Sequence, residues 1–314
     1  MENERSNNIF LSEGINVLSL FDGISCGQVA LNRAGIKVNN YFASEIDKHA
    51  IKVTQSNYPN TIQIGDVTKV QGVDLPKIDL LMGGSPCQGF SFSGKQLNFD
   101  DPRSKLFFEF VRLIEEVKPK YWLLENVVMK QEYQDVISKH LGVEPIKLNS
   151  ALTSSQNRVR LYWANFDITE PTDQGIKLED VIEDVSVYRI PKNYHKYIPN
   201  ENPKFVDPYN KKAITKNKSS TLRTNVNNGN MWVKVINGYR NLTVSECEKL
   251  SNLPIGYTKQ ATEAQAKKQM GNGWEVGMIT HIFNQMSAQA DKECGEEKNI
   301  ITADMHEPSI KTGT

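Results

Sequence analysis

Short apolar runs alternate with amphipathic stretches over residues 14–165, and this alternation constrains the fold more than any other feature. We expect strands at Ile15–Phe21, Tyr41–Ser44, Ile78–Met82 and Tyr121–Leu124, and helices at Cys26–Gly35, Lys48–Asn57 and Leu106–Val117. Strands and helices in this order predict an α/β fold with a Rossmann-like parallel sheet covered on both faces. Ligands of such sheets bind beyond the carboxyl ends of the strands, so residues that follow strands are the functional candidates.

The character of the sequence changes after Phe166. Residues 166–239 are rich in Asn, Lys and Pro and predict a small irregular domain. Helical patterns then return, because Thr243–Glu246 and Thr262–Gln265 both match the capping box. We therefore expect a large domain at 14–165 plus 240–286, the small domain at 166–239, and disordered tails at 1–13 and 287–314.

Overall charge gives no indication of a nucleic-acid partner, because the 314 residues contain 37 basic and 37 acidic side chains. Between Ser186 and Val235, however, Lys and Arg greatly outnumber the two acids Glu201 and Asp207. A basic segment on a neutral body can bind phosphates, although a solvated Lys-rich surface would explain the same excess.

Several classes of protein are disfavoured by the same sequence. No apolar stretch is long enough to cross a membrane, and the N-terminus lacks the apolar core of a signal peptide. The cysteines at 26, 87, 247 and 294 form no close pair and no metal-ligand spacing. We therefore expect a cytoplasmic protein without a metal site.

Residues at three successive strand ends together predict a pocket for a nucleoside cofactor. The loop Phe21–Gly27 joins a strand to a helix, and its glycines allow close approach of a ligand. Glu45 follows the second strand, where a carboxylate can hold ribose hydroxyls, and Asp66 follows a further strand before Ile78–Met82, where it could accept from an adenine amino group. The dinucleotide motif G-x-G-x-x-G is absent, which disfavours NAD.

Cys87 lies in the sequence Gly84-Ser-Pro-Cys-Gln-Gly-Phe-Ser91 at a predicted strand end. A buried structural cysteine usually lies within an apolar helix or strand, so this position favours a presented, reactive thiol. A free thiol in a turn is the competing interpretation. The segment Phe90–Ser104 that follows has no periodic apolar face and predicts a lid.

Two further motifs contain candidate catalytic groups. Glu125 ends an apolar strand, where burial would raise its pKa and make it a donor to a ring nitrogen, although it could instead cap a helix. Gln156, Arg158 and Arg160 share one face of a predicted strand. The two guanidiniums could orient Glu125, lower the pKa of Cys87 or hold a carbonyl oxygen and phosphate, but the strand could also be merely exposed and amphipathic.

Together these motifs resemble the cytosine-C5 DNA methyltransferase family. The matching segments, in family order, are Phe21–Gly27, Ser44–Asp47, Gly65–Val67, Gly84–Ser91, Glu125–Val127, Gln156–Arg160, Arg240–Pro254 and Gly271–Trp274. Phe21–Ile24 and Lys211–Asn228 are closer to the de novo enzymes of animals, whereas Ser93–Gln96 and Leu106–Phe108 are similar to bacterial or phage enzymes.

The resemblance implies a methyltransferase sheet that binds S-adenosylmethionine, in a catalytic and cofactor-binding domain, and a smaller target-recognition domain. It implies cofactor contacts by Phe21, Asp22, Gly23, Ile24, Gly27, Glu45, Ile46, Asp66, Val67, Pro86, Leu106, Asn272 and Trp274. It also implies that Cys87 attacks carbon 6 of a flipped-out cytosine, Glu125 donates to nitrogen 3, Arg160 holds the carbonyl at position 2, and Arg158 positions Cys87 and phosphate.

Double-stranded DNA is the partner that the resemblance implies, in a bacterial or phage-infected cell. Whether a restriction endonuclease is paired with the enzyme, or the enzyme is an orphan, stays open at this point. The DNA contacts that we expect are Gln88, Ser91, Ser93, Lys95, Asn126, Gln156, Lys218, Ser220, Thr221, Arg223 and Asn227. Within Lys216–Asn228, Arg223 suits guanine and the Asn residues suit adenine. The recognition domain is short for the family, which predicts a short recognition site.

Two other functions fit a sequence of this kind. One branch of the family methylates cytosine in tRNA, but it usually has Pro-Pro-Cys-Gln-Pro-Phe-Thr where this chain has Ser85-Pro-Cys-Gln-Gly-Phe-Ser91. A catalytically idle DNA-binding member should have damaged motifs, whereas Cys87, Glu125, Arg158 and Arg160 are all present.

Overall fold

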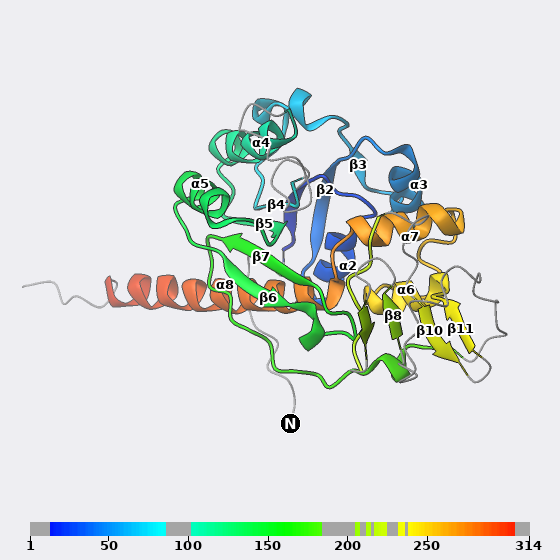
Figure 1. The fold of residues 1–314 in the computed structure, drawn as a ribbon. Helices are drawn as coiled ribbons and strands as arrows, with labels where there is room; N and C mark the ends of the chain where they lie inside the picture. The colour runs from blue at the N-terminus through cyan, green and yellow to red at the C-terminus, as the bar shows by residue number, and fades with distance from the viewer. Residues whose placement is uncertain are drawn as a thin grey trace, which may run out of the picture.

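The computed structural model describes residues 13–85, 102–183, 205–207, 212–214, 217–224, 232–235 and 238–304. Within these residues a seven-stranded sheet has the order β3-β2-β1-β4-β5-β7-β6 (Figure 1). Its strands are β1 (Ile15–Leu20), β2 (Val38–Ser44), β3 (Ile62–Gln63), β4 (Leu80–Gly83), β5 (Tyr121–Val127), β6 (Ile146–Asn149) and β7 (Val159–Ala164). Strand β1 is parallel to β2 and β4, and β4 to β5, which confirms the predicted α/β fold.

Helices cover both faces of this sheet, so its central strands are buried on both sides. One face carries α2 (Cys26–Arg33), α3 (Lys48–Asn57) and α8 (Val276–Asp304), and the other carries α4 (Pro102–Val117) and α5 (Gln131–Leu141). In β1, Ile15 and Val17 belong to the first core and Leu18 and Leu20 to the second, as the alternation of side chains in a strand requires.

The sheet is mixed rather than wholly parallel. Strand β7 runs antiparallel to β5, and β6 runs antiparallel to β7, so the last two strands form an antiparallel edge. Strand β5 is also longer than predicted and continues to Val127. Glu125 therefore lies within a paired strand, where its backbone is fixed by hydrogen bonds to β7.

Both predicted capping boxes are confirmed at the helices that follow residues 166–239. Thr243 begins α6 (Val244–Leu250), and its hydroxyl accepts from the Glu246 amide while the Glu246 carboxylate accepts from the Thr243 amide. Thr262 and Gln265 form the same pair of bonds at α7 (Glu263–Asn272). Short 3₁₀ turns lie at Val67–Lys69, Gly72–Asp74, Ser150–Leu152 and Leu178–Asp180.

A second, antiparallel sheet lies in the predicted recognition region (residues 166–239), which we predicted to be irregular. Its order is β11-β10-β8-β9, from β8 (Phe205–Asp207), β9 (Lys212–Ile214), β10 (Trp232–Val235) and β11 (Gly238–Asn241). The expected domain boundary between 239 and 240 falls inside β11, because Tyr239 and Arg240 both pair with β10. The four strands lie beside α6 in Figure 1.

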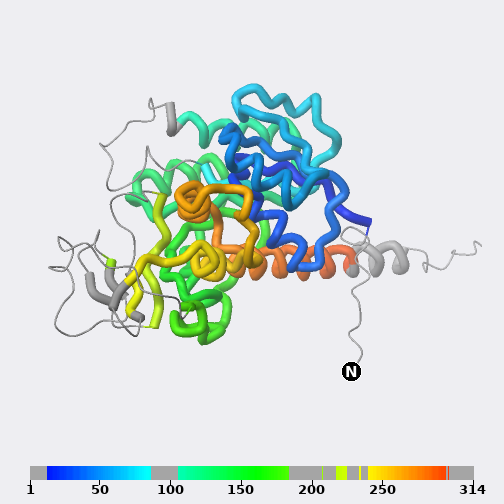
Figure 2. Tube along the Cα trace, turned by 90° about the vertical axis from the view of Figure 1, so that its right-hand side faces the viewer, coloured from blue at the N-terminus to red at the C-terminus, as the bar shows by residue number. Residues whose placement is uncertain are grey.

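The predicted disordered tail from 287 is wrong as far as residue 304, because α8 continues to Asp304. Met286 and Ala290 are buried in the first core, and the Glu293 carboxylate accepts from the Tyr121 hydroxyl at 2.8 Å. These contacts stabilise the C-terminal part of α8. The mixed polar sequence of this segment gives little indication of an apolar helix face. Figures 1 and 2 both show α8 running along the main sheet. In the described part of the chain, no helix has both the length and the apolar character that crossing a membrane requires.

Candidate active site

The loop between β1 and α2 has an unusual backbone conformation. Phe21, Gly23 and Ser25 all have positive φ angles of 56°, 60° and 56°. For Phe and Ser this left-handed conformation costs about 1–3 kcal/mol, and such strain persists where surrounding contacts fix the backbone. Asp22 holds this loop in place, because its carboxylate accepts hydrogen bonds from the hydroxyls of Ser19, Ser25 and Tyr41.

Burial raises the pKa of Asp22 to about 6, despite the three hydroxyl donors, which lower it, and the charge of Glu45 raises it further. The folded protein therefore keeps a proton on Asp22 at pH values where the unfolded chain, with a pKa of 3.8, has lost it. The stability that this carboxyl contributes is consequently complete below pH 3.8 and decreases as the pH rises to about 6.

We expect the free energy of unfolding of the wild type, measured relative to Asp22→Asn, to fall by about 3 kcal/mol between pH 3.8 and 6, since one pKa unit corresponds to about 1.4 kcal/mol. Urea unfolding at a series of pH values measures this difference. Asp66→Asn is the control of opposite sign, because hydrogen bonds from Thr68 lower the pKa of the exposed Asp66. A flat profile for Asp22→Asn relative to the wild type would contradict the prediction.

Glu45 connects the end of β2 to the β1–α2 loop. Its Oε2 accepts from the Gly23 amide at 2.7 Å, and its Oε1 accepts from the amides of Ile46 and Asp47 at 2.8 Å each. The side chain of Ile46 is 76% exposed beside this carboxylate. Asp66 is also exposed, and its Oδ1 accepts from Thr68. An exposed apolar side chain thus lies next to the Glu45 carboxylate at the strand ends.

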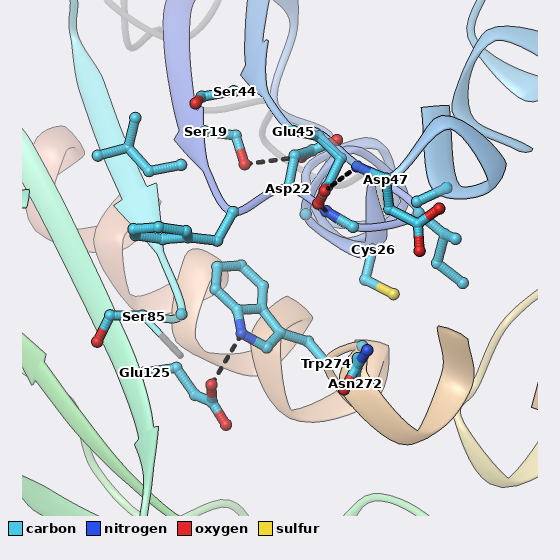
Figure 3. Close-up of a pocket in the computed structure, with 18 of the residues that line it drawn as sticks. Ser19, Asp22, Cys26, Ser44, Glu45, Asp47, Ser85, Glu125, Asn272 and Trp274 are labelled. Atoms are coloured by element: carbon cyan, nitrogen blue, oxygen red, sulfur yellow. Dashed lines mark hydrogen bonds between the residues drawn. The ribbon is translucent and has the colours of Figure 1, made fainter. Parts of the chain in front are cut away.

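These groups line one cavity of about 460 Å³ (Figure 3). The cavity is lined by every predicted cofactor residue that the structure describes: Phe21, Asp22, Gly23, Ile24, Gly27, Glu45, Ile46, Asp66, Val67, Leu106, Asn272 and Trp274. Glu125, Arg158 and Arg160 line the same cavity. The predicted cofactor and catalytic side chains of the described residues therefore share one space.

Part of the predicted site lies outside the described residues. This applies to Pro86, Cys87, Gln88, Ser91, Ser93, Lys95 and Asn227. The last described residue before Cys87 is Ser85, which is buried and accepts a hydrogen bond at Oγ from the Asn126 amide at 3.0 Å. Asn126 thereby fixes the backbone that leads out of β4 toward Cys87.

The carboxylate of Glu125 has a hydrogen-bond donor on each oxygen. Arg160 Nε lies 2.9 Å from Oε1, and the indole Nε1 of Trp274 donates to Oε2 at 3.1 Å. Both partners approach from other parts of the chain, β7 and the loop between α7 and α8. The predicted interaction between an Arg of this motif and Glu125 is present, whereas the bond from Trp274 had no counterpart in our sequence interpretation.

Arg158 bonds to the backbone of the protein, and its predicted role of positioning Cys87 and phosphate stays a prediction. The side chain is buried and donates to the carbonyl oxygens of Gly271 and Gly273, the latter at 2.8 Å. Burial lowers the pKa of Arg158 to about 10, and the neighbouring charge of Arg160 lowers it further. Arg158 thus holds the backbone of the last motif against the sheet.

Several residues that we assigned to DNA contacts have hydrogen-bond partners within the protein, and their assignment to DNA stays a prediction. Gln156 is buried, and its amide donates to the Leu250 carbonyl and accepts from the Leu222 amide. Lys218 donates to three carbonyl oxygens, those of Ala151, Ser154 and Ile176. Asn126 is also buried, with the bond to Ser85 described above.

Arg223 and Thr221 likewise have partners within the chain. The two terminal nitrogens of Arg223 donate to the two carboxylate oxygens of Asp207, whose side chain is fully buried. Thr221 donates to the Asn157 carbonyl at 2.7 Å. The guanidinium of Arg223 therefore anchors β8, and its assignment to guanine stays a prediction. Ser220 is half-buried and its assignment stays a prediction.

Comparison with known proteins agrees with the arrangement of the site. A family model described as C-5 cytosine-specific DNA methylase matches residues 15–167 and 130–288. Type II methyltransferase M1.ScrFI of Lactococcus lactis subsp. cremoris is 30% identical over 310 residues, covering 88% of this chain and 79% of that protein. Orphan methyltransferase M.SPRI of Bacillus phage SPR is 37% identical over 164 residues, covering 47% of this chain and 37% of that protein.

Solved structures show the same fold at lower identity. A DNA modification methyltransferase encoded within an E. coli prophage matches with a TM-score of 0.63 and 21% identity, covering 87% of this chain and all of that one (100%). Spodoptera frugiperda DNMT2 matches with a TM-score of 0.66 and 17% identity, covering 86% and 98%. With the sequence matches, these findings show that the chain belongs to the C-5 cytosine-specific DNA methylase family and is a DNA (cytosine-5)-methyltransferase that uses S-adenosylmethionine.

Proposed function

We propose that Cys87, Glu125 and Arg160 carry out the methylation of a cytosine that is swung out of double-stranded DNA. The observation that carries this proposal is the placement of Glu125, which lies between Arg160 and Trp274 in the cavity that also contains Glu45 and Asp66. A carboxyl beside a guanidinium is suited to bind the nitrogen and carbonyl edge of a pyrimidine.

The residues of the cavity fit S-adenosylmethionine by their chemistry. The carboxylates of Glu45 and Asp66 can accept from hydroxyl and amino groups, and exposed Ile46 offers an apolar surface to a base. Asp22, whose pKa is about 6, is ionised at neutral pH and adds negative charge beside these groups, where a sulfonium would be stabilised. When bound, the cofactor supplies an electrophilic methyl group.

Each residue then has a distinct task. The Cys87 thiolate forms a bond to carbon 6, a protonated Glu125 donates to nitrogen 3, and Arg160 holds the oxygen at position 2. The electron density that reaches the ring makes carbon 5 nucleophilic. After methylation, a water molecule takes the carbon 5 proton, the double bond to carbon 6 forms again, and the Cys87 sulfur leaves with the electrons of its bond to carbon 6. Nitrogen 3 returns its proton to Glu125.

Two buried cysteines, Cys26 and Cys247, do not offer the same reactivity. Burial raises the pKa of Cys26, which lines the cavity, to about 12, and it raises the pKa of Cys247 to about 12 as well. Since the thiolate is the nucleophile, both thiols are inert at neutral pH. This supports Cys87 as the reactive thiol.

The substrate and the role of Glu125 are tested together by tritiated methyl transfer from S-adenosylmethionine to duplex DNA, single-stranded DNA and tRNA. We expect duplex DNA to be the best acceptor and Glu125→Gln to lower the rate about 10²- to 10⁴-fold, the usual contribution of a general acid. Glu132→Gln is the matched control, because Glu132 is exposed and lies outside the cavity. Faster transfer to tRNA, or full activity of Glu125→Gln, would contradict the proposal.

We also propose that the enzyme modifies a short site in the DNA of a bacterial or phage-infected cell, paired with a restriction endonuclease. The type II methyltransferase relative supports this partner. Bisulfite sequencing of a genome that expresses the chain identifies the site. An endonuclease encoded with the chain should then cut only unmodified DNA at that site, and cleavage of fully modified DNA would rule out the pairing.

A further inference from the structure

The two oxygens of the Glu125 carboxylate are held from opposite sides. Arg160 Nε bonds one oxygen at 2.9 Å and Trp274 Nε1 the other at 3.1 Å, and the Glu125 side chain is only 11% exposed. A carboxylate with a donor on each oxygen has its plane fixed, because rotation about its terminal bond would break both bonds at once. Removing the indole donor therefore releases one side of the carboxylate.

Gly84 packs against the bond between Trp274 and Glu125. A Cβ on Gly84 would lie 2.9 Å from Glu125 Oε2 and 3.0 Å from Trp274 Nε1, so any side chain at this position would press on both partners. The glycine after β4 thus leaves the space that this hydrogen bond needs. The contact is part of the packing between three segments rather than an isolated meeting of two side chains.

The backbone on both sides of Trp274 is fixed as well. Before it, Arg158 holds the carbonyls of Gly271 and Gly273. After it, Glu275 is buried and accepts from the amides of Gly277 and Met278 at the start of α8. Since the residues on either side are anchored, the indole has little freedom to leave Glu125.

The ring of Trp274 also forms part of the cofactor cavity. Figure 3 shows the indole between Glu125 on one side and Asp22 and Glu45 on the other. The same side chain thus contacts the space for the cofactor with its ring and the candidate acid with its N–H group. These two functions can be separated, because phenylalanine retains an aromatic ring but lacks the donor.

We infer that Trp274 is a positioning residue that orients the Glu125 carboxyl toward the target base from within the wall of the cofactor pocket. This inference rests on the proposed role of Glu125. Its consequence is that the N–H group contributes to the rate of methyl transfer, whereas the ring contributes to cofactor binding.

Trp274→Phe tests this separation. We expect the single-turnover rate of methyl transfer to fall about tenfold, as for loss of one hydrogen bond, while the Kd for S-adenosylhomocysteine stays within about threefold of the wild type. Trp163→Phe is the matched control: it removes a buried indole bond to Ser138 outside the cavity and should reduce stability without this selective loss of rate. An unchanged rate in Trp274→Phe, or equal losses of rate and cofactor affinity, would overturn the inference.

A second readout needs no turnover. The chain has four tryptophans, so its indole ¹⁵N–¹H spectrum contains one signal for each, and Trp274→Phe identifies the signal of Trp274. We expect this proton to shift upfield in both Glu125→Gln and Gly84→Ala and to stay in place in Glu132→Gln. An unchanged chemical shift of the Trp274 indole proton in Glu125→Gln would overturn the inference. If the signal moves but Glu125→Gln remains fully active, the contact stands, the proposed role of Glu125 fails, and the inference falls with that role.

Discussion

Cys87→Ala should abolish methyl transfer to DNA, with a loss of about 10⁴-fold or more, because removal of a covalent nucleophile leaves carbon 5 of cytosine unactivated. S-adenosylhomocysteine should still bind, since the carboxylates and apolar groups of the cavity come from other segments. Single-turnover transfer of a tritiated methyl group measures the rate, and calorimetry measures cofactor binding. Residual activity near that of the wild type would mean that another group attacks the base.

A matched control variant and a covalent trapping experiment show whether this loss is specific to Cys87. Cys294→Ala, on the distant helix α8, should keep full activity because Cys294 lies outside the cavity. In duplex DNA with 5-fluorocytosine at the target, fluorine cannot leave carbon 5 as a proton does, so the sulfur bond to carbon 6 should persist. A covalent complex is expected with the wild type and not with Cys87→Ala.

Arg240→Met should lower the free energy of unfolding by about 3–5 kcal/mol, the usual cost of leaving one partner of a buried ion pair without its counter-charge. The side chains of Arg240 and Glu246 are 1% and 0% exposed, and two guanidinium nitrogens bond the two carboxylate oxygens. Arg240 also donates to the Glu183 carbonyl, which ties the recognition region to α6. Equilibrium unfolding in urea measures the loss.

Arg112→Met provides the comparison for this stability change. Arg112 lies on α4 and pairs with Glu109 and Glu116, but its side chain is 29% exposed and these pairs are partly solvated. Exposed helical pairs contribute only a few tenths of a kcal/mol each, so the loss should stay below about 1 kcal/mol. Equal losses in Arg112→Met and Arg240→Met would show that the Arg240 pair is not buried in solution.

The main sheet could be predicted from sequence because its signal is local. Alternation and apolar runs placed β1, β2, β4 and β5, and the capping boxes at Thr243 and Thr262 placed the starts of α6 and α7. The antiparallel edge formed by β6 and β7 depends on pairing between segments, which periodicity does not report. The end of α8 was missed because Met286 and Ala290 acquire an apolar environment only when other elements pack against them.

Contacts between distant segments account for the rest of the site. Glu125 and Trp274 are 149 residues apart, and neither sequence context indicates that they meet. The polar residues Gln156, Lys218 and Arg223 have the composition of a DNA-binding surface, yet their partners are carbonyls and carboxylates of the protein itself. A polar side chain gives no local indication of whether tertiary structure will bury it.

The docking of residues 217–224 has a consequence for hybrid enzymes made by exchanging recognition domains. This segment lies within the predicted recognition domain, but its partners Gln156, Asn157 and Ala151 belong to the larger domain, and its backbone at Arg223 packs directly against Gly271. A donor sequence inserted as one block from 166 to 239 would have to reproduce all of these contacts. Breakpoints placed on either side of 217–224 would instead leave the host's own support for the cofactor pocket in place.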